Sequence, residues 1–488
     1  MTRHLTIERT TLIILFIMLF ALATRVQVDT DMWWHLRTGQ WQIENQEVVR
    51  VDHFSHTFTG EPRTHYEWFA QIILYGLWSL GGDFALSLFT ATLATGGMAF
   101  LYRSSEGNTY LRAFAMILGA SASAVFWSAR PQMFSFFFST VVIWILYLYK
   151  RKQTDRLWLL PLLFLIWAQL HVGWSIGLII LGGTIAGEIL NNLLKSKTDH
   201  IVSWQRGPRL VVFSVLSGLV LLINPYGLDL LLVPFQTVSI GPLTQYIQEW
   251  NPPDFAMPEV WPFVTLLILT ALLMIRDWRK LDWTEVILAG GSAFLAVNAS
   301  RNISFFAVVA TPIVTYHLNA LLIRRGWTLQ TVKRPSKLMV RINVLLIVLI
   351  AVGAFANLLV VADPEMVADA KAMTLPVGAI EYVNEEQPPG AMFNSYNWGG
   401  YIMFHAQDYP VFIDGRTDLY RDFVLDWVRL TTAGANWRED FETFGINLVI
   451  VETNVPLSDA LRDEPGWTLA YEDEVSVVFT RDETHDSN

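Results

Sequence analysis

Long apolar segments without charged residues constrain the fold of this chain more than any other feature of its sequence. They recur at residues 10–25, 66–80, 84–102, 111–127, 132–149, 157–170, 173–193, 210–224, 259–275, 284–299, 302–323 and 340–362. Because about 20 apolar residues in a helix cross the hydrocarbon core of a bilayer, these segments predict a multi-pass helical membrane protein. Charged residues make up only 16% of the chain, whereas soluble domains carry about 25%.

The distribution of lysine and arginine predicts how the chain crosses the membrane. Basic clusters occur within 3–9, 103–112, 150–156, 195–209, 276–280 and 324–341, whereas 225–258 has no lysine or arginine. Basic loops remain cytoplasmic, and all six clusters fall on that side if 66–80 is a helix in the outer interface. We therefore expect about eleven spans in the cytoplasmic (plasma) membrane, with the N-terminus cytoplasmic. An alternative reading of 10–25 as a signal peptide, cleaved after Ala23, also leaves the following residues outside.

The composition changes after Val361. Residues 363–488 are acidic and contain no apolar run long enough to span, so they predict one extracytoplasmic α/β domain after a transmembrane domain of residues 1–362. The residue pattern in this domain predicts strands at 409–413, 447–452 and 475–480. It predicts helices at 418–432 and 437–444.

Two global features exclude classes of function. The formal net charge of -10 argues against a nucleic-acid partner, which requires a basic surface. The chain has no cysteine, which excludes disulfide bonds, thiolate zinc sites and iron–sulfur clusters.

The first outer loop contains two carboxylates directly after the membrane exit, Asp29 and Asp31. A helix that begins at Asp31 would place His35 one turn later on the same face. A carboxylate at this position can accept a proton from an acceptor group or bind a divalent cation. The structural alternative is that Asp31 caps the N-terminus of an interfacial helix.

Three further outer loops contain unusual polar residues, among them Arg130, Glu249 and Arg301. An isolated outer arginine opposes the positive-inside tendency, so Arg130 and Arg301 predict anionic partners such as lipid phosphates or the first-loop carboxylates. The alternative is that both side chains snorkel to ordinary headgroups. We expect His171 to be a hydrogen-bonded residue and not a ligand. Carboxylates and arginines on one face suit the displacement of a phosphate from a lipid-linked donor.

The sequence predicts one span, an outer acidic motif, interfacial helices, further spans and a terminal outer α/β domain, in that order. This order resembles the GT-C glycosyltransferase superfamily, and in particular the catalytic subunit of oligosaccharyltransferase. The first-loop sequence from Asp31 to Arg37 is similar to an acid followed by an aromatic-rich helix, and Glu249-Trp250-Asn251-Pro252 resembles a later loop motif. Arg301 is similar to a span-starting arginine that contacts the donor phosphates. The sequence from Tyr396 to Tyr401 loosely resembles the acceptor-binding WWDYG motif, and Asp414-Gly415-Arg416-Thr417-Asp418 follows it.

Two departures from that family affect the expected acceptor and cofactor. The loop 128–132 has no acidic residue, and no aspartate stands between the aromatic residues at 396–401. The acceptor is therefore expected to differ from an Asn-X-Ser/Thr peptide. The cofactor that the resemblance implies is Mg²⁺ or Mn²⁺ held by Asp31 and Glu249, but metal-independent relatives such as protein mannosyltransferases also have the first-loop acid.

The resemblance implies inverting transfer of a sugar or glycan from a polyprenyl-phosphate or polyprenyl-pyrophosphate donor to a glycan, lipid or protein acceptor outside the membrane. Asp31, with Asp29, would act as general base, and Arg301 with Arg130 would bind the donor phosphate. Glu249 and His35 would orient the acceptor or a cation. The outer domain would hold the acceptor through Tyr396, Trp398, Tyr401, Asp414 and Arg416. Structural turns are the alternative roles for the segments 398–401 and 414–418.

Two other functions remain compatible with the sequence. A lipid-linked glycan polymerase or ligase would have a large outer loop rich in arginine and histidine, whereas the long loop here is acidic. A transporter or scaffold for lipid-linked precursors would need ionisable residues near mid-bilayer, and these segments contain almost none.

Overall fold

The computed structural model describes residues 5–241, 246–327 and 335–482. The chain divides into two compact units, each built from separate stretches of sequence. The first, called the membrane unit here, comprises Met1–Arg25, Ser87–Leu231 and Ile247–Val360. The second, called the α/β unit, comprises Val26–Leu86, Leu232–Tyr246 and Val361–Asn488. The first outer loop thus groups with the C-terminal region, whereas the predicted division at residues 362 and 363 remains a prediction from sequence.

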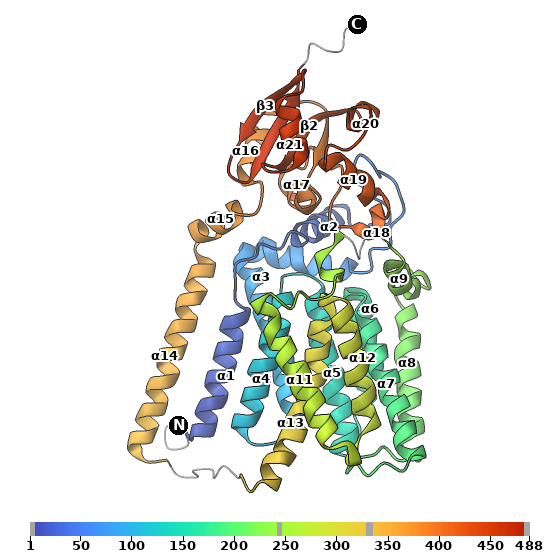
Figure 1. Cartoon of the computed structure of the whole chain (residues 1–488), viewed down its shortest axis with the longest axis vertical. Helices are drawn as coiled ribbons and strands as arrows, with labels where there is room; N and C mark the ends of the chain where they lie inside the picture. Colours follow the sequence, from blue (N-terminus) through green and yellow to red (C-terminus); the bar gives the residue numbers. More distant parts are fainter. Residues whose placement is uncertain (1–4, 242–245, 328–334, 483–488) are drawn as a thin grey trace. The chain divides into compact units, whose positions relative to one another are not determined.

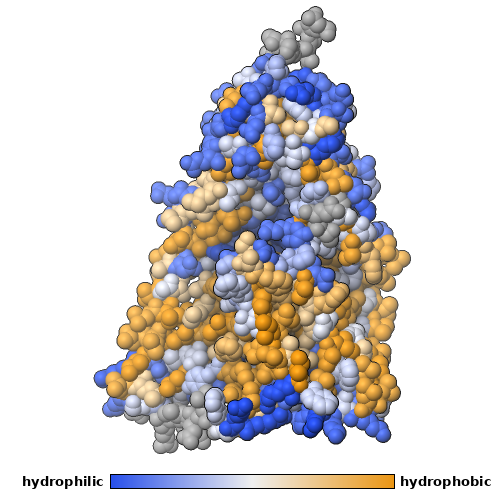
Figure 2. Space-filling view, in the orientation of Figure 1, coloured by the Kyte–Doolittle hydropathy of each residue, from blue (hydrophilic) through white to orange (hydrophobic). Residues whose placement is uncertain are grey.

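Each of the segments predicted to span in the membrane unit is helical. Its helices are α1 (Ile7–Ala23), α4 (Thr109–Ser123), α5 (Gln132–Arg151), α6 (Leu159–Leu170), α7 (Trp174–Leu193), α8 (Gly207–Leu219), α11 (Trp261–Arg276), α12 (Trp283–Asn298), α13 (Ile303–Arg324) and α14 (Lys337–Ala362). They run roughly parallel to one another, with apolar side chains over their outer surface (Figures 1 and 2). Within the described residues, seven helical stretches are long and apolar enough to cross a membrane. The chain is therefore an integral membrane protein, as predicted.

Helix α3 (Trp68–Ser104) joins the predicted interfacial segment to the next predicted span. A straight helix of its 37 residues would be about 55 Å long, which exceeds the hydrocarbon core of about 30 Å. The backbone leaves helical geometry at Gly81 and Gly82, and Gly82 has φ of +55°. Glycine adopts this conformation without a Cβ clash, so the pair bends the helix between its two parts.

Ionisable side chains in the spans are more numerous than the sequence analysis allowed. Glu188 lies on α7, Glu285 on α12 and His317 on α13, and all three are buried. Lys150 and Arg151, at the end of α5, pair with carboxylates of this group. The groups gather at one end of the bundle, where they neutralise one another.

The α/β unit is built around a four-stranded sheet in its described residues. The strands β1 (Ala391–Asn394), β2 (Ile446–Glu452), β4 (Ser476–Arg481) and β3 (Trp467–Glu472) lie in the order β1-β2-β4-β3. β1 is parallel to β2, and the other two pairs are antiparallel. Val449 at the centre of β2 faces Phe393 on one side and Phe479 on the other, and all three are fully buried. The predicted α/β domain is thereby confirmed.

Further helices, some of which contact the sheet, lie wholly or largely in the α/β unit. They are α2 (Met32–Asn45), α9 (Asp229–Val238), α15 (Pro364–Ala372), α16 (Val377–Glu386), α17 (Gly399–His405), α18 (Thr417–Tyr420), α19 (Phe423–Thr431), α20 (Trp437–Phe444) and α21 (Pro456–Arg462). The helix predicted at 437–444 is confirmed, but that at 418–432 is divided into α18 and α19. The division falls at Arg421, whose φ is +49°.

The strand predicted at 409–413 is wrong. Val411 forms only an isolated bridge, to Ser55 in the first loop. The side chain of Asn394 occupies the next bonding positions, because its Oδ1 accepts from Phe412 N–H (2.8 Å) and its amide donates to the Ile413 carbonyl (2.8 Å). The apolar run is buried as expected, but an asparagine side chain pairs with it in place of a neighbouring strand.

Candidate active site

Three predicted site residues converge in the membrane unit, two of them predicted for donor binding and the third, Glu249, predicted to orient the acceptor or a cation. Glu249 lies on the short helix η4 (Gln248–Trp250), Arg301 lies on η7 (Ser300–Asn302), and Arg130 precedes α5. Arg130 Nη2 lies 3.1 Å from Glu249 Oε2, and Arg301 Nη1 lies 3.4 Å from Oε1 of the same carboxylate. The Arg301 guanidinium also lies 4.2 Å from the centre of the Trp250 ring. One carboxylate thus holds two guanidinium groups in place.

The backbone joins the two loops that carry this cluster. Ser300 donates to the carbonyl of Asn251 through both its backbone N–H and its hydroxyl, each at 2.9 Å. The loop containing Glu249 is therefore attached to the turn that contains Arg301. Arg130 is oriented separately by Gln132, whose Oε1 accepts from its Nη2 at 2.6 Å.

The electrostatics of the cluster leave a net positive charge. Burial opposes ionisation of Glu249, but Arg301 and Arg130 outweigh this effect and lower its pKa to about 2. Burial and the same two arginines lower the pKa of His171 to about 3, so the imidazole is neutral near pH 7. Two arginines with one carboxylate carry an excess of one positive charge, which suits a phosphate.

His171 orients the start of α7 and does not act as a charged group. Its Nδ1 accepts from the Gly173 N–H at 3.1 Å and lies 2.7 Å from the Ser135 hydroxyl. The indole of Trp167 donates to the same hydroxyl at 2.8 Å. The hydrogen-bonded role predicted for His171 is confirmed.

The two first-loop aspartates have different roles at the beginning of α2. Asp29 Oδ1 accepts from the Asp31 N–H at 3.0 Å, which closes a local turn. Asp31 occupies the N-cap position, but its side chain makes no capping hydrogen bond. The capping alternative for Asp31 therefore does not describe the structure, and its carboxylate is directed elsewhere.

The carboxylate of Asp31 lies against Gly415 of the C-terminal region. A Cβ atom at position 415 would overlap Asp31 Oδ1 and would lie 3.3 Å from the indole nitrogen of Trp34. The neighbouring helix α17 reaches the start of α2 in the same way, because a Cβ at Gly400 would lie 3.0 Å from the Thr30 carbonyl oxygen. Gly400 and Gly415 therefore permit their segments to approach the start of α2, and Gly415 approaches Asp31 itself.

Asp414 and Arg416 hold this turn from the inside. Arg416 donates to both oxygens of Asp414 (2.8 and 2.6 Å) and to Asp52 (2.5 Å), and these three side chains have no exposed surface. The two aspartates raise the pKa of Arg416 further above its usual range, despite burial. A fully buried guanidinium cannot contact an acceptor here, so the geometry supports the turn-forming alternative for 414–418.

The aromatic residues of the predicted acceptor motif are likewise buried. Tyr396 bonds to Thr417 through its hydroxyl, and burial together with the nearby Asp31 raises its pKa well above 10. Trp398 donates to the Thr374 carbonyl at 3.0 Å. Tyr401 packs edge-to-face on Trp33 of α2, with ring centres 5.1 Å apart. Their role in holding an acceptor remains a prediction.

His35 lies inside the α/β unit between two helices. It is 6% exposed, and its Nδ1 lies 3.4 Å from the amide nitrogen of Gln71 on α3. Its ring stacks on Trp34. This packing fixes α2 against α3, and an effect of His35 on an acceptor or cation remains a prediction.

Arg63, Glu67 and Asp418 form a second charged group that the sequence analysis did not select. Arg63 donates to both oxygens of Asp418 (2.8 and 3.0 Å), lies 3.5 Å from Glu67, and stacks over the Trp34 ring. Burial, assisted by Asp418, raises the pKa of Glu67 to about 7 although Arg63 opposes the shift. Arg63 is an arginine outside the predicted basic loops, so the argument that selected Arg130 and Arg301 would have identified it.

A polar cavity of about 220 Å³ lies beside this group within the α/β unit. It is lined by Pro62, Arg63, Thr64, Tyr66, Val233, Gln236, Thr237, Ile240, Asp418 and Arg421. Most of these side chains donate or accept hydrogen bonds, and Asp418 lies three residues beyond Gly415. The cavity can therefore bind a ligand with several hydroxyl groups.

At phosphate-binding sites, Mg²⁺ keeps several waters and is bound through one or two carboxylates together with the substrate phosphates. Among residues 5–241, 246–327 and 335–482, no group of three or more His, Asp or Glu side chains is arranged to hold a metal. Glu249 is already paired with two arginines. The Mg²⁺ or Mn²⁺ that the sequence suggests remains a prediction.

No protein-family model matches the chain, and no curated protein matches its sequence. Its fold matches the archaeal oligosaccharyltransferase AglB from Archaeoglobus fulgidus, solved with an inhibitory peptide and a dolichol-phosphate, with a TM-score of 0.53 and 11% identity over 90% of this chain and 69% of that one. It also matches ArnT from Cupriavidus metallidurans bound to undecaprenyl phosphate, with a TM-score of 0.51 and 13% identity over 97% of both chains. Both neighbours are GT-C glycosyltransferases, so the predicted resemblance is confirmed at the level of the fold.

Proposed function

We propose that this chain, which has the membrane-helical and α/β architecture of the GT-C glycosyltransferases, transfers a sugar from a polyprenyl-phosphate-linked donor to a hydroxyl-bearing acceptor at the extracytoplasmic surface. The observation that carries the proposal is the pair of guanidinium groups, Arg130 and Arg301, that share the single carboxylate of Glu249. The excess positive charge suits a lipid phosphate, and both structural neighbours were solved with a polyprenyl-type phosphate bound.

Asp31 would act as the general base in this reaction. Its carboxylate is not used as a helix cap, and Gly415 leaves room for it. The acceptor oxygen attacks the anomeric carbon, the bond from that carbon to the phosphate oxygen breaks, and the acceptor proton passes to Asp31. Attack opposite the departing phosphate inverts the anomeric centre.

Arg301 and Arg130 would stabilise the charge that develops on the departing phosphate. Each already lies in a fixed position, Arg301 over Trp250 and Arg130 beside Gln132, so little reorganisation is needed during the reaction. Glu249 would orient both guanidinium groups from the opposite side. Removing one such preorganised donor typically lowers the rate by about 100- to 1,000-fold.

The polar cavity beside Asp418 would receive the acceptor. Gln236, Thr237 and Thr64 offer donors and acceptors for several hydroxyl groups, and Tyr66 offers a ring for packing. These properties favour a saccharide or another polyol over an apolar acceptor.

Turnover of a mixed pool of polyprenyl-phosphate-linked sugars by the purified protein tests the proposal. Asp31→Asn and Arg301→Gln should each lower sugar release by at least about 100-fold, whereas Glu259→Gln, an exposed control in the membrane unit, should not change it. Equal release by the wild type and Asp31→Asn would contradict the role of Asp31.

A second comparison tests the acceptor site. Gln236→Leu should raise KM for a saccharide acceptor while donor hydrolysis without acceptor remains unchanged. A parallel loss of both activities would show that Gln236 supports the fold and not the acceptor.

A further inference from the structure

A second cavity lies at the other end of the membrane unit from the arginine cluster. Arg130 precedes the first residue of α5, whereas Lys150 and Arg151 are at the end of this 20-residue helix, about 30 Å away. The cavity has a volume of about 100 Å³ and opens among α5, α7, α12 and α13. The positive-inside rule predicts that this end is cytoplasmic.

The wall of the cavity is apolar on one side and charged on the other. Its aliphatic side consists of Ile143, Leu146, Leu288, Val309, Pro312 and Ile313. Its charged side contains two cations, Lys150 and Arg151, and three carboxylates, Glu106, Asp282 and Glu285. An apolar wall below a charged rim, at the end of a membrane bundle, matches the shape and polarity of a phospholipid.

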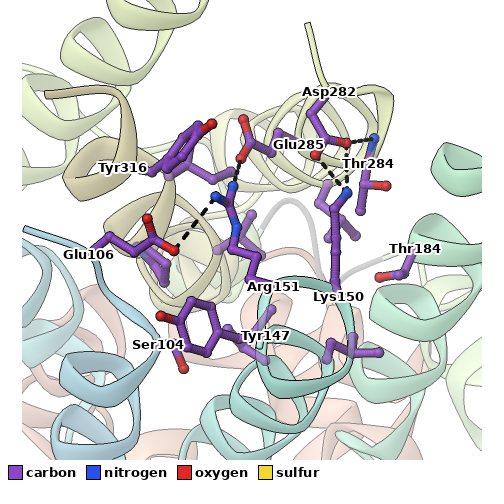
Figure 3. A pocket seen from close by; sticks show the side chains of 16 residues that line it. Ser104, Glu106, Tyr147, Lys150, Arg151, Thr184, Asp282, Thr284, Glu285 and Tyr316 are labelled. Carbon is purple, nitrogen blue, oxygen red and sulfur yellow. Dashed lines mark hydrogen bonds and ion pairs between the residues drawn. The ribbon is translucent and has the colours of Figure 1, made fainter. Parts of the chain in front are cut away.

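Two carboxylates hold Lys150 in place. Its ammonium pairs with Glu188 and lies 2.8 and 2.6 Å from the two oxygens of Asp282 (Figure 3). Its N–H groups donate to Glu188 Oε1 and Asp282 Oδ1, whereas Asp282 Oδ2 accepts no hydrogen bond from any described residue. Asp282 Oδ1 also accepts from Asn191 at 2.8 Å, so contacts within the protein hold this half of the rim.

Arg151 has one group that this network does not satisfy. Its Nη2 donates to Glu285 at 2.6 Å, and the guanidinium lies 3.8 Å from the centre of the Tyr316 ring. Its Nη1 is buried and makes no hydrogen bond to any described residue. An oxygen of the Glu106 carboxylate lies 3.9 Å from Nη1 (Figure 3), which is too far for a hydrogen bond.

Glu106 and the orphan Nη1 thus offer an acceptor and a donor on either side of a narrow gap. Both oxygens of Glu285 are already engaged, because the second accepts from His317 at 2.7 Å. The side chain of Glu106 is 24% exposed, so a ligand can reach it. A buried hydrogen-bond donor without an acceptor raises the free energy of the folded protein. A ligand oxygen that accepts a hydrogen bond from Arg151 Nη1 would remove this free-energy cost.

The balance of charge selects the type of headgroup. Together with Glu188, which pairs with Lys150, the three rim carboxylates face two cations, and this excess of negative charge opposes a purely anionic ligand. A zwitterionic headgroup can place a phosphate oxygen on Arg151 and an ammonium group on Glu106. A primary ammonium group has N–H donors for the carboxylate, whereas a quaternary ammonium group has none.

We propose that this cavity binds the headgroup of a phospholipid with a primary amine, with its phosphate on Arg151 Nη1, its ammonium on Glu106 and its first chain carbons against the aliphatic wall. Such a lipid would sit at the predicted cytoplasmic surface and join α5 to α12 and α13. The site is separate from the arginine cluster proposed for the sugar donor, and its occupancy does not require glycosyl transfer.

Thermal unfolding of the full-length protein in detergent–lipid micelles tests this site. Phosphatidylethanolamine should raise Tm saturably over phosphatidylcholine of the same acyl chains, because a ligand that binds only the native state stabilises it. Phosphatidylglycerol and inorganic phosphate should give smaller shifts. Native mass spectrometry should retain one phosphatidylethanolamine on the wild type.

Glu106→Gln removes the charge that the ammonium group needs, and Glu259→Gln is the matched control at an exposed position of the same unit. The first substitution should weaken phosphatidylethanolamine binding by about tenfold, and the second should leave it unchanged. Equal shifts for the two zwitterionic lipids, a larger shift for the anionic lipid or phosphate, or identical binding by the two variants would each overturn the proposal.

Discussion

The carboxylate of Asp31 lies so close to Gly415 that a Cβ atom at position 415 would overlap its Oδ1 atom. The two residues are far apart in the sequence, but both belong to the α/β unit. The first-loop acid is therefore positioned by the C-terminal region, and the absence of a side chain at residue 415 leaves the space that its carboxylate occupies.

Gly415→Ala should abolish the proposed sugar transfer without unfolding the protein. The new methyl group would meet the end of one flexible side chain, so Asp31 can rotate away while the backbone remains in place. We expect sugar release to fall by about 100-fold, as for the loss of a positioned acid–base group, with Tm little changed. Parallel turnover and thermal-unfolding measurements check this expectation.

Gly399→Ala is the informative comparison for that variant. Here a Cβ would overlap the Ile413 carbonyl oxygen and lie 2.7 Å from the Cα of Asp414, and neither backbone atom can rotate away. This substitution should lower Tm markedly. If Gly415→Ala lowered Tm as much as Gly399→Ala, the loss of activity would reflect misfolding and not the displacement of Asp31.

Removing the buried guanidinium of Arg416 should destabilise the α/β unit strongly. Arg416→Met leaves Asp414 and Asp52 as two buried carboxylates without their common partner, which should cost about 3–5 kcal/mol. Arg438→Met removes an arginine that pairs with Glu464 on the surface, and its effect on Tm should be small. Thermal unfolding of the two variants would contradict this account if their shifts were equal.

His171 should make the protein less stable as the pH falls below neutrality. An imidazole in the unfolded chain binds a proton below about 6.5, whereas burial and two arginines lower the native pKa of His171 to about 3. The unfolded state therefore binds more protons between these values, so stability rises with pH through this window and is lost on acidification. His171→Asn should flatten the dependence of Tm on pH between 4 and 7, whereas His53→Asn, at an exposed histidine, should retain it.

Glu67 should have the opposite effect near neutral pH. Its native pKa of about 7 lies above the unfolded value of about 4.3, so the native state binds more protons between the two. Its contribution to stability is complete at low pH and is lost as the pH rises through about 7. Glu67→Gln should therefore raise Tm relative to the wild type at pH 8.5 but not at pH 5. The exposed control Glu61→Gln should show no such difference, and a wild-type-like slope in Glu67→Gln would contradict the assignment.

The sequence predicted the residue types of the donor cluster but not their geometry. Arg130 and Arg301 were selected because outer arginines oppose the charge rule of membrane proteins, and Glu249 was selected from a motif in the long loop. The carboxylate of Glu249 lies between both guanidinium groups because loops far apart in the sequence meet in the fold. Hydrogen bonds from Ser300 to the Asn251 carbonyl join the loop of Glu249 to the loop of Arg301. Local pattern contains no information about such a pairing.

The sequence alone determined the helical membrane architecture, the acidic α/β region and the positions of most spans, because apolar length and charge asymmetry act locally and survive without tertiary contacts. Only the tertiary structure decided the state of individual side chains. It showed that the Asp31 side chain makes no capping hydrogen bond, that Arg416 is fully buried, and that the Asn394 side chain pairs with Phe412 and Ile413 in place of a neighbouring strand. Each of these outcomes depends on which groups are available to pair with a buried hydrogen-bond donor or a buried charge. Those partners come from segments that meet only when the chain is folded.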